Sequence, residues 1–198
     1  MNIGILGGTF NPPHIGHLIV AEHVRTELAL DRILFIPAAT PPHKVNDGII
    51  DAHHRVQMLR LATQGNPHVD VAEIEIARGG VSYTADTLQQ LHVEHPSDQF
   101  FLLIGMDNLL EFHTWRSPEA ILELATVVVM TRPGFAPHDV PAAMREKVVI
   151  CPVPEIDIAS RQIRKRVAEG KSIRYLVPDS VREYITRFEL YRAVPDRH

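Results

Sequence analysis

Short apolar runs alternate along the chain with segments whose apolar residues recur at helical spacing. The runs predict strands, which lie at residues 2–6, 32–37, 69–76, 99–104, 126–131 and 147–151. Helical spacing predicts helices at residues 17–28, 52–63 and 84–95, and a broken helical stretch at 107–124. The run at residues 100–104 contains no polar position, which is typical of a parallel sheet covered on both faces. The pattern therefore predicts an α/β fold built on a doubly wound, mostly parallel sheet.

After Cys151 the pattern changes, and no further strand is predicted. Two helices and a turn are expected there, at residues 160–169, 180–188 and 173–176. We expect a single domain of residues 1–198, in which residues 1–151 form the α/β core. Residues 152–198 then form a small helical C-terminal subdomain packed on the sheet. Ligands of such sheets bind beyond the carboxyl ends of the strands, so the segments that follow strands are the places to look for a site.

Composition and charge narrow the class of protein. The chain has 198 residues, 45% of them apolar, which is enough for one well-cored domain. Its net charge of −4 argues against a nucleic-acid binder, and no apolar run approaches the ~18 residues of a membrane span. One cysteine, Cys151, excludes an internal disulfide framework and fits the reducing cytoplasm. We expect a cytoplasmic protein, and the sequence leaves a homo-oligomer open.

The strongest candidate for a ligand site is the segment at residues 7–17, between the first strand and the first helix. Gly7 and Gly8 have no Cβ, so the backbone there can approach a ligand closely and adopt a positive φ. His14 and His17 are three residues apart and point to the same side of a helix start, where free N–H groups favour an anion. A glycine-rich turn alone is usually only a turn, but the two histidines beside it indicate a phosphate pocket.

Four further segments, together with residues 7–17, carry a resemblance to a known family. They are residues 41–44, residues 80–88, residues 104–107 followed by Trp115, and residues 158–164. In this order they resemble the bacterial nicotinate-nucleotide adenylyltransferases, which belong to the nucleotidyltransferases with an H-x-G-H motif after the first strand of a Rossmann-like fold. The H-x-G-H motif indicates only the superfamily, whereas S-Y-T-x-D-T-L and the tryptophan indicate this branch. The resemblance covers nearly the whole chain.

The resemblance implies adenylyl transfer from ATP to nicotinate mononucleotide, giving deamido-NAD and pyrophosphate in NAD biosynthesis. The acceptor phosphate is already largely dianionic near neutral pH, so the reaction needs alignment and charge neutralisation rather than a general base. His14 and His17 are implied as the catalytic groups at the ATP phosphates, and Asp107 is implied at the adenosine ribose. The remaining implied ATP-binding residues are Gly7, Gly8, Thr9, Phe10, Ser160 and Arg164. Mg²⁺ is expected to enter with ATP, and no protein metal site is predicted.

The second phosphate segment departs from the family pattern at two positions. Ser160 stands where the N-cap of a helix is expected, and Arg164 follows four residues later on the same face. In the family motif I-S-S-T-x-I-R, the first serine is replaced by Ala159 and the threonine by Arg161. Only Ser160 and Arg164 are therefore carried over, and the role of Arg161 stays open. Asn11 likewise stands where many members of the superfamily have Asp.

The sequence indicates the residues that bind the acceptor less clearly than those that bind ATP. The N–H groups at the start of the helix near Thr84, with its hydroxyl, suit a carboxylate without a dedicated arginine. Trp115 is expected to stack on the pyridine ring, and Lys44 and Arg132 are candidates for the mononucleotide phosphate. Without the resemblance, Thr84 would be a helix start and Trp115 a packing residue.

Three other functions remain open at this point. Pantetheine-phosphate and nicotinamide mononucleotide adenylyltransferases share the phosphate motifs, and a non-catalytic nucleotide sensor would share the fold. A metal-binding protein is suggested by the 12 histidines, but their spacing matches no zinc site.

Overall fold

The computed structural model describes residues 1–40, 48–131 and 140–192. Six strands form one sheet in the order β3-β2-β1-β4-β5-β6, and every neighbouring pair is parallel. The strands are β1 (Asn2–Gly8), β2 (Arg32–Pro37), β3 (Val69–Val71), β4 (Gln99–Gly105), β5 (Thr126–Thr131) and β6 (Val148–Pro152). The strand order reverses between β1 and β4, so the predicted doubly wound, Rossmann-like sheet is confirmed.

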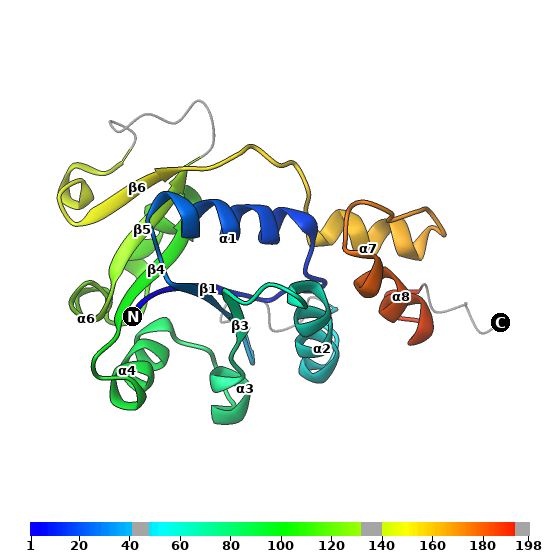
Figure 1. Ribbon diagram of the computed structural model, residues 1–198, viewed down its shortest axis with the longest axis horizontal. Helices are drawn as coiled ribbons and strands as arrows, with labels where there is room; N and C mark the ends of the chain where they lie inside the picture. The colour runs from blue at the N-terminus through cyan, green and yellow to red at the C-terminus, as the bar shows by residue number, and fades with distance from the viewer. Residues whose placement is uncertain (41–47, 132–139, 193–198) are drawn as a thin grey trace.

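Helices cover both faces of this sheet, as the continuous apolar strands require (Figure 1). They are α1 (Ile15–Glu27), α2 (Ala52–Thr63), α3 (Ile74–Arg78), α4 (Thr84–Glu94), α5 (Met106–Leu110), α6 (Pro118–Leu124), α7 (Ser160–Ala168) and α8 (Asp179–Arg187). Two short 3₁₀ helices lie at Phe112–Thr114 and Ala142–Met144. Ala21 and Val24 of α1 pack on one face with Ile33, whereas Leu88 and Leu91 of α4 pack on the other.

The strand predicted at residues 69–76 is wrong in its second half. Only Val69–Val71 pair with β2, and the chain then turns into the short helix α3. The alternating pattern of this segment looks like a strand, but α3 uses it differently. Ile74 joins the core, and the buried carboxylate of Glu75 accepts a hydrogen bond from the Thr87 hydroxyl at 2.8 Å. A tertiary contact to α4 thus overrides the local pattern.

The C-terminal helices pack on α2 rather than on the sheet, which corrects the expected docking face. Ile163 of α7 and Val181 and Ile185 of α8 form one apolar cluster with Met58 of α2. Figure 1 shows α7 and α8 beyond the end of the sheet, next to α2. The division into a core of residues 1–151 and a subdomain of residues 152–198 stays a prediction. In the described ranges, no helix has the length and apolar character needed to cross a bilayer.

Candidate active site

One cavity brings together the four side chains that were predicted to hold a triphosphate. It has a volume of about 600 Å³, and His14, His17, Ser160 and Arg164 all line it. A smaller recess of about 150 Å³ is lined by His17, Ser160 and Arg164 together with Thr9 and Phe10. Residues almost 150 positions apart in the chain therefore meet where β1 ends and α1 begins.

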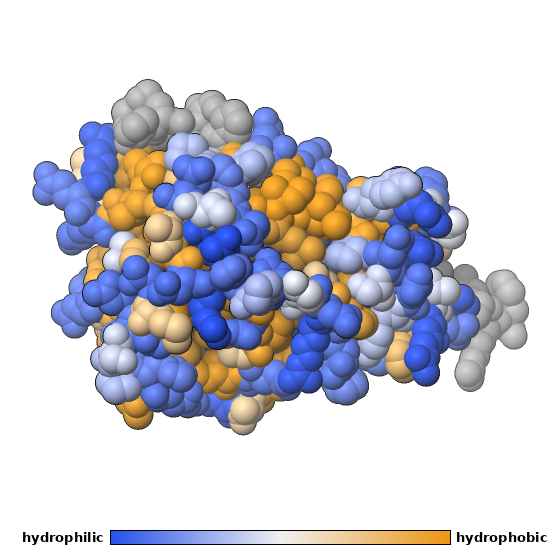
Figure 2. Space-filling view, viewed as in Figure 1, coloured by the Kyte–Doolittle hydropathy of each residue, from blue (hydrophilic) through white to orange (hydrophobic). Residues whose placement is uncertain are grey.

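The opposite wall of the larger cavity is apolar. Val20 of α1 contributes to it, and so do Val153, Ile156 and Ile158 from the chain that follows β6. Figure 2 shows apolar surface gathered between α1 and this segment. The cavity thus joins a polar, partly cationic end to an apolar wall, a combination that suits a ligand with both a phosphate chain and a ring.

The two histidines form a stacked pair at the start of α1. His14 is the N-cap residue, and its backbone N–H donates to Nδ1 of His17 at 3.1 Å. The two ring centroids are 3.6 Å apart, and the Phe10 ring packs edge-on against His17 with centroids 5.1 Å apart. Because Nδ1 of His17 accepts this bond, a neutral ring carries its proton on Nε2, where it can donate to a ligand oxygen.

Burial keeps both rings neutral at pH 7. It lowers the pKa of His14 to about 4. Burial, together with a smaller contribution from the charge on protonated His14, lowers the pKa of His17 to about 3. Two stacked imidazolium rings would repel each other in a site with little water, so the pair acts through N–H donors rather than through fixed charges.

We expect acidification to destabilise the fold through this pair. In the unfolded chain both histidines take up protons near pH 6.5, whereas His14 and His17 in the folded chain resist until about pH 4 and 3. Between these values the unfolded state binds more protons, so stability falls as the pH falls, by about 2–4 kcal/mol between pH 7 and pH 5. Chemical denaturation at both pH values measures this loss. If acidification from pH 7 to pH 5 lowered the free energy of unfolding of a His17→Asn variant as much as that of the wild type, the loss could not be assigned to the histidine pair.

Ser160 and Arg164 reach back to the loop that precedes His14. The Ser160 hydroxyl donates to the Pro12 carbonyl at 2.8 Å, and Nη1 of Arg164 donates to the Asn11 carbonyl at 2.8 Å. The expected N-cap role of Ser160 is wrong, because Ala159 occupies that position and Ser160 is the first helical residue. Its hydroxyl bonds a distant segment instead of its own helix. Arg161 is exposed but also lines the larger cavity.

The glycines do not make the turn that was expected of them. Gly7 and Gly8 are the last residues of β1, and neither has a positive φ. The residue with a left-handed backbone is Phe10, at φ +49°. A Cβ on Gly8 would lie 2.9 Å from the Phe10 ring. Gly8 is therefore needed to seat the aromatic ring that packs against His17.

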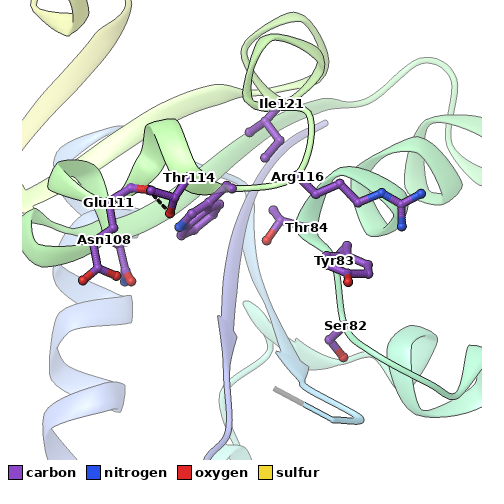
Figure 3. A pocket seen from close by; sticks show the side chains of 9 residues that line it. Ser82, Tyr83, Thr84, Asn108, Glu111, Thr114, Arg116 and Ile121 are labelled. Atoms are coloured by element: carbon purple, nitrogen blue, oxygen red, sulfur yellow. Dashed lines mark hydrogen bonds between the residues drawn. The ribbon is translucent and has the colours of Figure 1, made fainter. Parts of the chain in front are cut away.

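A second cavity contains Thr84 and Trp115, two of the four residues that were predicted to bind the acceptor (Figure 3). It has a volume of about 260 Å³, and both Thr84 and Trp115 line it. Thr84 is the first residue of α4, so free backbone N–H groups face this region. Figure 3 shows Thr84 across the pocket from Asn108 and Glu111. Trp115 packs against Phe112 with ring centroids 5.4 Å apart.

Arg116 is a lining residue that the sequence interpretation missed. The sequence predicts a carboxylate site without a dedicated arginine, whereas Arg116 lines this pocket. Its guanidinium lies 4.7 Å from the centre of the Tyr83 ring and forms an ion pair with Asp86 at 3.2 Å. The signal in the sequence was its position next to Trp115.

Three predicted residues that the structure describes, Gly7, Gly8 and Asp107, line none of these cavities. Asp107 is exposed in α5, just beyond the carboxyl end of β4, and lines neither cavity among the described residues. Lys44 and Arg132 lie outside the described residues. Two histidines outside the cavities are bonded within the fold: His54 to the Tyr184 hydroxyl at 2.9 Å, and His92 to the Leu124 carbonyl at 2.6 Å.

Comparison with known proteins identifies the family of this chain. Residues 5–166 match the family model described as cytidylyltransferase-like. Two relatives bear the name "Probable nicotinate-nucleotide adenylyltransferase". The protein of Thermomicrobium roseum is 48% identical, with 97% of this chain and 92% of the relative covered. The protein of Roseiflexus sp. is 46% identical, with 96% and 98% covered.

A solved structure agrees on the fold. The nicotinic acid mononucleotide adenylyltransferase of Plasmodium falciparum, complexed with NaAD, superposes with a TM-score of 0.77 at 19% identity. The alignment covers 96% of this chain and 97% of that one. At this identity the likeness concerns the fold alone, whereas the family model and the relatives above 40% identity concern the sequence itself. The chain therefore belongs to the nicotinate-nucleotide adenylyltransferase family of cytidylyltransferase-like nucleotidyltransferases.

Proposed function

We propose that this protein transfers the adenylyl group of ATP to nicotinate mononucleotide, with His14, His17, Ser160 and Arg164 around the triphosphate. The observation that carries the proposal is the convergence of these four side chains on one cavity. The acceptor phosphate attacks the α-phosphorus, the bond from that phosphorus to the bridging oxygen breaks, and pyrophosphate leaves. Deamido-NAD is the other product.

The chain's part in this reaction is alignment and charge stabilisation. The acceptor is already a good nucleophile, so what limits the rate is the approach of two anions and the charge that develops on the leaving pyrophosphate. Nε2–H of His17, held by its Nδ1 bond to the His14 backbone, and the Arg164 guanidinium are preorganised donors for that charge. The apolar wall of the same cavity suits the adenine ring, and Asp107 remains our candidate for the ribose.

Magnesium fits this site as a partner of ATP rather than as a resident ion. Among the described residues, no three His, Cys, Asp or Glu side chains gather in a way that could hold a metal. Mg²⁺ keeps several waters and is usually bound through substrate phosphates in such enzymes. We propose that the triphosphate carries it in and that it neutralises charge there. The cytoplasm, where thiols stay reduced, fits a chain with the single buried thiol of Cys151.

We propose that the second cavity binds the acceptor. Trp115 offers a face for the pyridine ring, and the start of α4 at Thr84 offers N–H donors for the carboxylate. Pyrophosphate release with ATP, Mg²⁺ and a panel of acceptors tests the assignment. We expect nicotinate mononucleotide to be used far better than nicotinamide mononucleotide or phosphopantetheine. Equal use of the amide would overturn the proposed basis of selectivity, and ATP binding with no pyrophosphate from any acceptor would favour a sensor.

Trp115→Ala should weaken the acceptor and spare ATP. Stacking of a ring on an aromatic side chain contributes about 1–3 kcal/mol, so KM for nicotinate mononucleotide should rise about 10-fold. KM for ATP should stay within about twofold, because Trp115 lines the second cavity and not the one with the two histidines. Trp115→Phe, which keeps a ring, should recover most of the loss. Equal rises in both KM values would show that Trp115 only supports the fold.

A further inference from the structure

Asn11 is a buried polar residue of the first phosphate segment that the proposed reaction leaves without a role. Many members of the superfamily have Asp at this position, and Asn11 is 3% exposed. Its Nδ2 donates to the Gly48 carbonyl at 3.3 Å, and its Oδ1 accepts from the Tyr191 hydroxyl at 2.8 Å. A carbonyl can only accept, so the Gly48 bond fixes which way the amide faces. A carboxylate at this position could not donate to Gly48, so the amide is required for both bonds.

The segment that Asn11 belongs to is the loop that leads into the histidine pair. Three carbonyls of this loop accept hydrogen bonds from side chains elsewhere in the fold. Arg55 donates to Thr9 at 2.9 Å, Arg164 donates to Asn11, and Ser160 donates to Pro12. Two of these donors are the residues assigned to the triphosphate. The position of the loop and the position of the phosphate-binding side chains are therefore coupled.

Arg55 anchors the loop to two other segments of the chain. It is 1% exposed, and no carboxylate in the described part of the chain forms an ion pair with it. Besides the Thr9 carbonyl, it donates to the carbonyls of Ile50 at 3.3 Å and Ala39 at 3.4 Å. Among the described residues, the acceptors of its hydrogen bonds are all backbone carbonyls, and these bonds offset the cost of burying the cation while they fix the backbone around it. It ties the loop to the segments that follow β2 and precede α2.

Tyr191 anchors the loop from the C-terminal side. It follows α8 and has a left-handed backbone at φ +63°, which a bulky residue adopts only when its surroundings impose it. Burial raises the pKa of its phenol above the ordinary value, although Arg164 and Arg55 oppose this effect. The hydroxyl therefore stays protonated and serves as the donor to Asn11. The bond spans 180 positions in the sequence and joins the C-terminal helical unit to the phosphate loop.

We propose that Asn11 and Tyr191 are positioning residues for ATP: their hydrogen bond holds the loop of residues 9–14 in the geometry that presents His14, His17 and Arg164 to the triphosphate. This inference rests on the proposed function, because it names what holds that site in place. Neither residue needs to touch the reacting atoms. Loss of the bond should therefore weaken ATP binding without changing the acceptor pocket, which lies at the start of α4.

The test removes one oxygen atom, and the chain supplies a matched control. Tyr191→Phe deletes the hydroxyl that bonds Asn11. Tyr184→Phe deletes a hydroxyl that bonds His54 at 2.9 Å, in the packing of α8 on α2. Both tyrosines are half-buried, but the Asn11 partner of Tyr191 is 3% exposed, so Tyr191→Phe should lose somewhat more thermal stability than Tyr184→Phe. Affinity is measured by calorimetry with α,β-methylene-ATP, in which a methylene carbon replaces the oxygen between the α- and β-phosphorus atoms, so the bond that the reaction breaks is absent. Turnover is measured with ATP and nicotinate mononucleotide.

We expect Tyr191→Phe to weaken the analogue about 5-fold, the equivalent of ~1 kcal/mol, and to raise KM for ATP to a similar extent. KM for the acceptor should stay unchanged, and Tyr184→Phe should stay within about twofold of wild type in every constant. Asn11→Ala with Tyr191→Phe should bind no worse than Asn11→Ala alone, because the hydroxyl has then already lost its partner.

Three results would overturn the inference: analogue affinity unchanged in Tyr191→Phe, an equal loss in Tyr184→Phe, or additive losses in the double variant. A wild type that does not bind the analogue would overturn it as well. If the wild type bound the analogue but released no pyrophosphate with nicotinate mononucleotide, the proposed function would be wrong. The analogue affinities of the variants would still decide whether Asn11 and Tyr191 position the loop.

Discussion

His17→Ala is expected to lower kcat by about 100- to 1000-fold, the usual effect of removing one preorganised donor from a site of charge development. The reason is geometric: the bond from the His14 backbone occupies Nδ1 and leaves Nε2–H aimed away from the helix. The ring is neutral at pH 7, so the loss is that of a directed hydrogen bond. Steady-state turnover by pyrophosphate release measures it, and binding of α,β-methylene-ATP should fall much less than kcat.

Two substitutions at the same position separate catalysis from helix capping. His17→Asn keeps an acceptor near the position of Nδ1, so it should preserve most of the stability and still lose turnover. His17→Gln keeps a donor near the position of Nε2, so it should lose some stability and recover part of the turnover. His23→Ala is the control on the same helix, because its ring bonds the Pro152 carbonyl and does not line the cavity. If turnover followed stability across all four variants, His17 would be a structural residue only.

The fold could be predicted from the sequence because its strands carry their own signal. Continuous apolar runs and helical spacing are local properties, and five of the six predicted strands agree with the structure to within a residue or two. The exception, residues 69–76, shows the limit of a local pattern. Whether such a segment pairs as a strand or folds into α3 depends on what it meets, here Thr87 of α4, and spacing does not encode that contact.

Site residues were easier to predict where the chemistry requires a particular residue type. They were harder to predict where a residue's role depends on a contact with a distant part of the chain. His14 and His17 could be proposed because an anion site needs donors at a helix start, whereas Ser160 and Arg164 came from the resemblance to the family motif; all four line one cavity, and their roles stay predictions. The bond from Tyr191 to Asn11 and the burial of Arg55 could not be predicted, because neither position carries a pattern of its own. The same holds for Gly8: its lack of a Cβ was noticed, but the Phe10 ring that requires it is a feature of the packing.

Arg164→Ala is expected to lower kcat/KM for ATP by about 100-fold or more, because it removes a charged donor from a desolvated phosphate site and leaves its backbone partner unpaired. Nη1 of Arg164 already bonds the Asn11 carbonyl, so the same guanidinium must hold the loop and bind the phosphates. A planar fork of five donors can do both, whereas an ammonium group cannot. Arg164→Lys should therefore still lose about 10-fold, although the charge is kept.

Two neighbours on α7 distinguish this double role from a general effect of positive charge. Lys165 is an exposed residue near Glu169 and lines neither of the two cavities that contain His17, so Lys165→Ala should leave kcat/KM unchanged. Arg161 lines the larger cavity from an exposed position, so Arg161→Ala should cost about threefold at low salt and nothing at 0.5 M salt, where exposed charges are screened. The loss in Arg164→Ala should persist at high salt, because its contacts are short and partly buried. Equal losses in the two arginine variants, abolished by salt in both, would mean that α7 supplies only a diffuse field and that the triphosphate is held elsewhere.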